Sequence, residues 1–212
     1  MVPMPQTSAA QTTSARSTEI LAACKKAFAD KGFDGASMQD LAKAAGMSAG
    51  NFYRYFQSKD AIIAALVETE LSMIEATFAR IHAAPDAAQA FIDNISAQID
   101  AMTADNTAAL WTEIEAAASR RSEIRSLFEN LMNTVIQHQF RIFAKISGLS
   151  TETSARSFAA HAQFILLLLR GVAAPCPAPS STGGSAPALK PLILRTIRDT
   201  LSDISKTKRN DT

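Results

Sequence analysis

The sequence predicts an all-α protein of about nine helices. Apolar residues recur at spacings of three and four along most of the chain, and no segment shows the alternation that is typical of a strand. Gly and Pro are scarce, at eight each among 212 residues, which favours helices. With 47% hydrophobic and 19% charged residues, the chain is typical of a soluble globular protein and can bury a sizeable core.

The N-terminal segment, residues 1–15, is polar and contains two prolines, so we expect a disordered arm. A first helix is predicted over about residues 16–31, because apolar side chains then recur at helical spacing. Gly32 is expected to end this helix, and Phe33 to fold back onto the core.

Two short helices are predicted next, joined by a tight turn. Ser37 can cap the first of them, with Asp40 as its reciprocal partner in a variant of the capping box. Gly46 is expected to end that helix, and Ser48 to cap the next one, over about residues 49–55. A helix, a tight turn containing glycine and a second helix form the unit associated with reading the major groove of DNA.

The remaining chain is expected to form longer helices with broad apolar faces. A stretch rich in Pro, Gly and Ser, residues 173–187, is predicted to be a flexible loop, and residues 207–212 a frayed tail. The predicted helices cover approximately residues 59–82, 86–103, 106–119, 122–147, 151–172 and 188–205.

Charge marks one region of the chain. The formal net charge is only +1, so any binding to nucleic acid must depend on a local patch. Residues 16–59 contain seven Lys or Arg and four Asp or Glu, a balance of +3, which leaves about −2 for the rest.

Both tyrosines of the chain lie within the second short helix. Phe52 and Phe56 share one face of that helix and are expected to pack inward, so Tyr53 and Tyr55 should point elsewhere. Two buried tyrosines are the alternative, but a two-turn helix has little further surface to bury. Exposed hydroxyls could contact phosphate oxygens, as could Lys59 at the start of the following helix.

Small residues stand at the beginning of the same helix. Ala49 and Gly50 would let the backbone approach the edges of bases. The alternative for Gly50 is that the turn needs the conformational freedom of glycine.

The run GMSAGNFYRYFQSKDAI, within Glu19–Ile62, resembles the DNA-binding domain of the TetR family of transcriptional regulators. The resemblance covers about a fifth of the chain and implies an operator of double-stranded DNA as partner. Arg54 could contact either a base or a phosphate. The residues implied in DNA binding are Ser37, Met38, Gln39, Ser48, Ala49, Gly50, Asn51, Tyr53, Arg54, Tyr55 and Lys59.

The resemblance further implies a DNA-binding domain over residues 16–58 and a ligand-binding and dimerisation domain over residues 59–206. A two-fold homodimer would bind a pseudo-palindromic operator. The alternative is that the last two apolar helices merely pack on their own subunit. The residues expected at the dimer interface are Phe158, Ile165, Leu166, Leu169, Leu189, Ile193, Ile197 and Leu201.

A small apolar or aromatic effector is expected to bind among the helices of residues 60–170 and to release a repressor from its operator. Each candidate side chain could instead be plain core. The residues expected to line the pocket are Phe78, His82, Met102, Trp111, Glu115, Phe128, Met132, Phe143, His161 and Phe164.

Other functions have little support in the sequence. Cys24 is interpreted as a buried hydrophobe and Cys176 as a loop residue, and no Cys–His cluster has the spacing of metal ligands. We therefore expect no metal, no cofactor and no enzymatic activity. A helical protein-interaction module and an all-α enzyme remain alternatives.

No membrane attachment is expected either. The N-terminal segment lacks the apolar core of a signal peptide, and the longest apolar run, residues 164–169, is too short to span a bilayer. We therefore expect a cytoplasmic protein.

Overall fold

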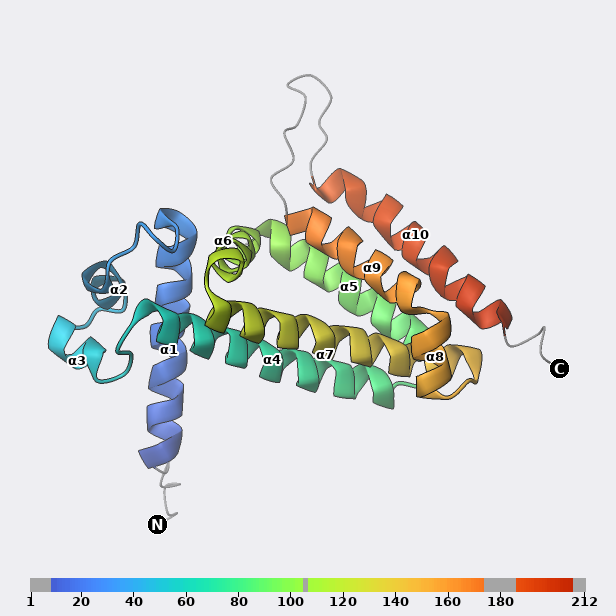
Figure 1. The fold of residues 1–212 in the computed structure, drawn as a ribbon, viewed down its shortest axis with the longest axis horizontal. Helices are drawn as coiled ribbons and strands as arrows, with labels where there is room; N and C mark the ends of the chain where they lie inside the picture. Colours follow the sequence, from blue (N-terminus) through green and yellow to red (C-terminus); the bar gives the residue numbers. More distant parts are fainter. Residues whose placement is uncertain (1–8, 105–106, 174–185, 208–212) are drawn as a thin grey trace, which may run out of the picture.

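The computed structural model describes residues 9–104, 107–173 and 186–207, and every element assigned within them is an α-helix (Figure 1). The all-α prediction is therefore confirmed. The ten helices of the described residues are α1 (Ala9–Lys31), α2 (Met38–Ala44), α3 (Ala49–Tyr53), α4 (Lys59–Ala83), α5 (Ala87–Ala104), α6 (Thr107–Arg120), α7 (Ser122–Ser147), α8 (Thr151–Ser157), α9 (Ala159–Ala173) and α10 (Ala186–Thr207).

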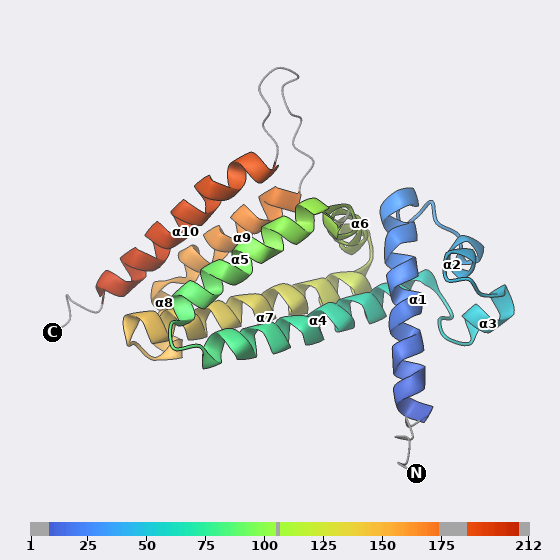
Figure 2. The same ribbon diagram turned by 180° about the vertical axis from the view of Figure 1, so that it is seen from behind.

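The helices form a head and a body (Figures 1 and 2). The head consists of α1, α2, α3 and the turn after them, residues 9–58, and lies at one end of the molecule. In the body, α4 and α7 pack side by side along the long axis, and α10 packs on α5 and α7. Helix α6 lies beside the head and contacts α1, so the body touches the head through both α4 and α6.

The predicted caps of the head are present. The Ser37 hydroxyl accepts a hydrogen bond from the Asp40 amide, and the Asp40 carboxylate accepts one from the Ser37 amide, which completes a capping box. The Ser48 hydroxyl caps α3 by accepting a hydrogen bond from the Asn51 amide, without a reciprocal bond. Gly32 and Gly46 end their helices with φ of 74° and 65°, a left-handed conformation that glycine adopts without strain.

Two helix boundaries in the head differ from the prediction. Helix α1 begins at Ala9, so residues 9–15 of the expected disordered arm are helical; they contain neither Pro nor Gly and can extend a helix that the later residues already stabilise. Helix α3 ends at Tyr53 because the amides of Arg54 and Tyr55 bond three residues back, in the tighter pattern of a 3₁₀ turn.

The helix expected over residues 151–172 is divided in two, so the part of the chain that the structure describes has ten helices where nine were predicted. Phe158 interrupts it with φ of −121° and ψ of 20°. Its ring is buried and meets the Phe143 ring edge-on, so packing into the core competes with continuation of the helix.

The expected loop and tail fall mainly on residues outside those that the structure describes, as does Cys176. Cys24 is fully buried in the core, and burial raises the pKa of its thiol to about 12. The thiol therefore behaves as a small hydrophobe, as the sequence predicts.

Buried apolar residues form two clusters that do not follow the division into head and body. The first cluster contains the core of the head together with the beginning of α4, most of α6 and the first half of α7. The second contains the rest of α4 and α7 with α5, α9 and α10. The head thus shares one continuous core with the near part of the body.

No described helix combines the length and apolarity that crossing a bilayer requires.

Candidate nucleic-acid interface and effector cavity

Helix α3 presents a row of small and polar side chains to solvent. Ser48, Ala49, Gly50 and Asn51 are all exposed, as the sequence analysis expected of residues that would face the major groove. Phe52 is fully buried on the opposite face and anchors the helix in the first cluster. One face of α3 is therefore anchored in the core, and the opposite face, formed by its first turn, is accessible to solvent.

The two tyrosines are exposed, by 47% for Tyr53 and 37% for Tyr55. Phe56 is buried beside Phe52, with 6.1 Å between the ring centroids. The alternation of aromatic residues thus separates two buried anchors from two accessible hydroxyls. Contact of these hydroxyls with phosphate remains a prediction.

Gly50 has no structural role that requires glycine. It lies in α3 with an ordinary helical backbone, and a Cβ added to it would meet nothing within 4 Å. The conformational freedom of glycine is not needed at this position, so the turn does not explain the residue.

The cations of the head fall into paired and unpaired groups. Arg16 pairs with Glu19, and Lys31 with Asp40 at 2.5 Å. The hydrogen bond from Lys31, followed by those from Ser37, holds the pKa of the Asp40 carboxyl well below its ordinary value. Among the described residues, Lys26, Lys43 and Arg54 are exposed and have no ion pair or hydrogen bond through their side chains. Arg54 is therefore free to contact an external anion.

Of the other expected contacts, Ser37 and Gln39 are exposed, whereas Met38 packs partly against the first cluster.

Lys59 is placed differently from the expectation of a free ammonium. Its Nζ donates to the carbonyl oxygens of Phe33, at 2.8 Å, and Asp34, at 3.2 Å, and lies 4.9 Å from the centroid of the Phe33 ring. The turn after α1 offers these carbonyls within reach, so the ammonium replaces water with fixed acceptors. Its expected role as a free phosphate clamp is not supported by this geometry.

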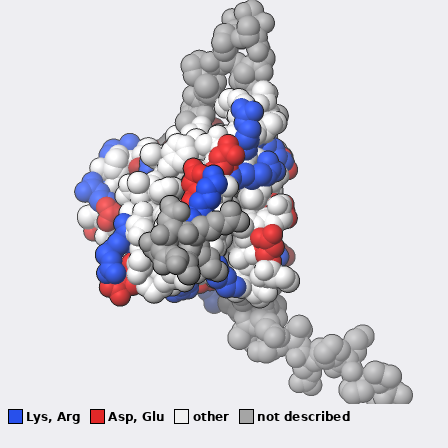
Figure 3. Space-filling view, turned by 90° about the vertical axis from the view of Figure 1, so that its right-hand side faces the viewer, with Lys and Arg blue, Asp and Glu red and all other residues white. Residues whose placement is uncertain are grey.

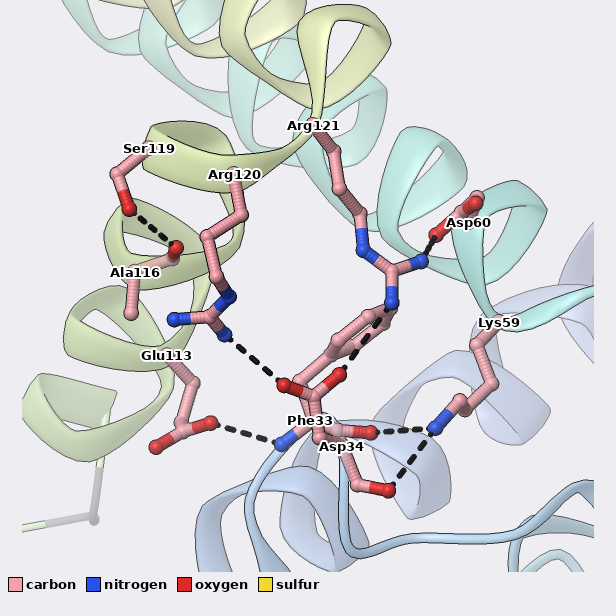
Figure 4. Close-up of polar contacts among 9 residues, drawn as sticks. All are labelled: Phe33, Asp34, Lys59, Asp60, Glu113, Ala116, Ser119, Arg120 and Arg121. Carbon is pink, nitrogen blue, oxygen red and sulfur yellow. Dashed lines mark hydrogen bonds and ion pairs between the residues drawn. The ribbon is translucent and has the colours of Figure 1, made fainter.

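The same turn is bound by residues of the body, and we call this set the head–body junction (Figure 4). The Glu113 carboxylate on α6 accepts a hydrogen bond from the Phe33 amide at 2.8 Å. The Phe33 ring is buried beneath two cations, since the Arg121 guanidinium carbon lies 4.7 Å from its centroid on the side of the body. The members of the junction are Phe33, Asp34, Lys59, Asp60, Glu113, Arg120 and Arg121.

Ion pairs complete the junction. Asp34 receives Arg120 at 3.0 Å and Arg121 at 3.3 Å, and Arg121 also binds Asp60 at 2.6 Å. Sequence analysis missed the roles of Glu113, Arg120 and Arg121, because these residues lie 80 or more positions from the turn that they bind. No local pattern carries that information.

A cavity of about 280 Å³ lies in the body between α4, α5, α6, α7 and α9. Five of the expected pocket residues line it: Met102, Trp111, Glu115, Phe128 and Met132. The lining comes from both hydrophobic clusters, with Trp111 and Phe128 packed on the first and Met102 and Val135 on the second. The cavity therefore occupies the seam between the two packing units.

The other five expected pocket residues do not line this cavity. Phe78 and Phe143 are buried in the second cluster, and Phe164 is 42% exposed. His161 packs edge-on against the Phe158 ring. The aromatic periodicity identified helix faces, but it could not tell which of them meet at a void.

His82 belongs to a separate polar chain. Its Nε2 lies 3.1 Å from Nδ1 of His138, whose Nε2 lies 3.0 Å from the Glu75 carboxylate. Burial, and then the neighbouring His138, Arg141 and Lys145, lower the pKa of His82.

Charged cavity residues complete the site. Glu115 pairs with Arg170 of α9, and Glu70 of α4 pairs with Lys25 of α1 at 3.4 Å. Apart from Glu115, sequence analysis did not assign these residues to the cavity, because charge at helical spacing looks the same on a solvated face.

The expected dimer residues are mostly buried within their own subunit. Phe158, Ile165, Ile193, Ile197 and Leu201 pack in the second cluster, and Leu166 and Leu169 line the cavity. The five buried side chains expose little surface to a partner, whereas Leu166 and Leu169 are half-buried, and an interface at these residues stays a prediction. Leu189 alone of the expected set is exposed, at 40%. The exposed apolar residues of α9 and α10 are Phe164, Leu167, Leu189 and Leu192.

Together, the fold and the two sites define an all-helical protein with an N-terminal helix-turn-helix head and a cavity in its body. Residues 20–66 match the family described as bacterial regulatory proteins, tetR family. The head and the beginning of α4 thus match the TetR family of transcriptional regulators.

The chain is similar to two curated relatives. It is 43% identical over 60 residues to the uncharacterized HTH-type transcriptional regulator YvdT of Bacillus subtilis, which covers 28% of this chain and 31% of that protein. It is 31% identical over 126 residues to the HTH-type transcriptional regulator UidR of Escherichia coli, a match that covers 57% of this chain and 60% of that protein. The matched region thus spans less than two thirds of the length of either relative.

Solved structures share the fold along nearly the whole chain. Salmonella enterica GusR superposes with a TM-score of 0.71 at 22% identity and covers 95% of this chain and 100% of that one. The transcriptional regulator FadR of Bacillus subtilis in complex with stearoyl-CoA gives 0.61 at 18% identity, covering 85% and 96%.

Proposed function

We propose that this protein is a ligand-responsive, DNA-binding transcriptional regulator that acts as a homodimer. The observation that carries the proposal is the surface of α3, where Ser48–Asn51 are exposed and Arg54 has no partner within the described residues. Exposed hydroxyls, an unpaired guanidinium and a helix open in front are the groups that contact the DNA backbone and base edges. Such a role fits a cytoplasmic protein.

Gly50 supports a close partner at this surface. Since neither backbone strain nor packing requires glycine, close approach of another molecule explains the missing side chain. Gly50→Ala should then leave the free energy of unfolding unchanged or raise it by about 0.5–1 kcal/mol, while weakening DNA binding. Urea unfolding and a DNA-binding titration measure the two effects separately. Unchanged DNA affinity would remove this support.

A salt series tests DNA binding itself. The full chain is titrated with genomic DNA fragments, including those around its own gene, and the logarithm of the binding constant is plotted against that of the salt concentration. Arg54→Ala should reduce the slope by roughly one. Arg156→Ala, at the far end on α8, is the matched control and should not change it. Equal effects of the two variants, or no binding by the wild type, would contradict the proposal.

Helices α4 and α6 each connect the proposed effector cavity to the turn after α1. Helix α4 contributes Glu70 to the cavity and begins at Lys59, which holds the turn after α1. Helix α6 contributes Trp111 to the cavity and holds the same turn through Glu113. A ligand that moves either helix would change the orientation of the head.

We propose repression relieved by a ligand with an apolar or aromatic body. In the dimer, two heads about 34 Å apart would bind successive major grooves, and a ligand that prefers another arrangement would lower operator affinity. FadR of Bacillus subtilis, of the same fold, was solved with stearoyl-CoA, so this fold accommodates a ligand. If every ligand that occupies the cavity leaves DNA affinity unchanged, this mechanism fails.

The proposed dimer interface consists of the exposed apolar residues Phe164, Leu167, Leu189 and Leu192 on α9 and α10. A two-fold axis through this face would bury side chains that are otherwise in water. Leu167→Glu should produce monomers in sedimentation equilibrium. Met73→Glu, at a residue that is 51% exposed on α4, is the matched control and should remain dimeric. A dimer that persists in the Leu167 variant would exclude this interface.

A further inference from the structure

The charged groups of the cavity define the chemistry that it can bind. Its lining includes two carboxylates, Glu70 and Glu115, and one guanidinium, Arg170. Glu70 lies deeper, with 20% of its side chain exposed, whereas the Glu115–Arg170 pair lies at the mouth with 46% and 43% exposed. Within the lining two carboxylates stand against one guanidinium, and Lys25, the partner of Glu70, lies outside the lining.

Aromatic side chains strengthen this asymmetry. Trp111 and Phe128 line the same space, and the faces of aromatic rings attract cations. Methionines and leucines form much of the remaining wall, and an apolar body would displace water from them.

We infer that the cavity binds an organic monocation with an apolar or aromatic body, and that Glu70 and Glu115 recognise its charge. The inference deepens the proposed function, and rests on it only in treating this ligand as the effector. Lys25, which pairs with Glu70, then competes with the ligand for the same carboxylate.

This competition involves the head directly. Lys25 belongs to α1, and its Nζ lies 3.4 Å from the Glu70 carboxylate, longer than a strong charged hydrogen bond. A bound cation would weaken this pair between α1 and α4. By linkage, loss of the pair must strengthen the binding of the cation.

The test uses the single tryptophan of the chain, Trp111, as a fluorescent reporter within the cavity. The full chain is titrated with phenyltrimethylammonium, with its neutral isostere tert-butylbenzene, and with the anion phenylacetate. The cation should bind at least about tenfold more tightly than either of the others. Equal affinity for cation and isostere, tighter binding of the anion, or no binding of the cation overturns the inference.

Variants assign the charge recognition to residues. Glu70→Gln and Glu115→Gln should each lower the affinity for the cation about tenfold and leave the affinity for the isostere unchanged. Glu68→Gln, exposed on α4 outside the cavity, is the control and should have no effect. If the glutamine variants bind the cation as the wild type does, the two carboxylates do not recognise it.

The link to the head has its own variant. Lys25→Met should raise the affinity for the cation several-fold, because Glu70 loses its competing partner. Lys26→Met, at the neighbouring residue that is exposed and has no ion pair among the described residues, is the control and should leave the affinity unchanged. Unchanged affinity in the Lys25 variant would refute the competition. DNA binding without any probe is measured in parallel, so failure of the ligand inference and failure of the regulator proposal are distinguishable.

Discussion

Among the described residues, the large hydrophobic side chains that the head exposes are two tyrosines, whereas those that α9 and α10 expose are one phenylalanine and three leucines. Exposed cations without an ion pair among the described residues occur in both regions, in the head at Lys26, Lys43 and Arg54 and in the body at Arg195 and Arg198. Arg156 and Lys206, at the end opposite the head, pair with acidic residues of their own helices. Figure 3 shows that opposite end, where blue and red are interspersed on the face in view. The head therefore suits a polar, anionic partner, and the α9–α10 face an apolar one.

The interior shows a different division. Buried residues of the head belong to the same cluster as parts of α4, α6 and α7, so the boundary at residue 58 separates functions but does not separate cores. The seam between cores lies deeper in the body, at the cavity. A ligand at that seam contacts both hydrophobic clusters. A small displacement of the side chains there would change how the two clusters pack against each other.

The largest expected effect compares the two cores. Phe52→Ala in the first cluster and Phe143→Ala in the second should each lower the free energy of unfolding by about 3–5 kcal/mol, because both rings are fully buried. Only the Phe52 variant should lose DNA binding under conditions where both remain folded, since it removes the anchor of α3. Urea unfolding and DNA titration measure this. Equal loss of DNA binding would show that the cores are not separable.

The head–body junction gives the next largest effect. Glu113→Ala should cost about 1–3 kcal/mol, because it leaves the amide of the buried Phe33 without its acceptor. Glu113→Gln is the matched variant, keeps an acceptor oxygen and should cost less. Denaturant unfolding of both variants measures the difference. If they are equally stable, the hydrogen bond does not hold the turn.

The smallest expected effect is on the pH dependence of stability in the body, because His82 is half-buried and partly screened by water. Its folded-state pKa lies below the ordinary 6.5, so the unfolded chain binds more protons as pH falls through that value. Stability should therefore decline as pH falls through 6.5 toward the lower folded-state pKa. His82→Gln should flatten this decline, whereas His161→Gln should retain it; a wild-type slope of opposite sign would contradict the assignment.

The head should respond in a lower window. The pKa of Asp40 is also lowered, from an ordinary 3.8, so its stabilising effect is complete above that value and is lost as pH falls below it. Asp40→Asn should flatten the pH dependence only in this acidic range, in thermal unfolding followed by circular dichroism. Coincident windows for the two variants would remove this distinction between head and body.

The sequence by itself determined the helices, their caps and which face of α3 is buried. Ser37 with Asp40, Gly32 with Gly46, and the alternation of Phe52 and Phe56 with two tyrosines act within a few residues, where backbone geometry fixes which groups can meet. These local relations also carried the resemblance to the TetR family.

Only the tertiary structure decided which helix faces meet a neighbour, a void or solvent. Ile197 and Leu189 carry the same apolar signal on α10, yet one is buried in its own subunit and the other is 40% exposed. From the sequence Lys59 is expected to be a free cation, but in the folded protein it donates to the turn at Phe33. Glu113 and Lys25 likewise bind residues that are distant in the sequence. Periodicity records that a face is apolar or charged, but contacts between distant segments depend on how all the helices pack together.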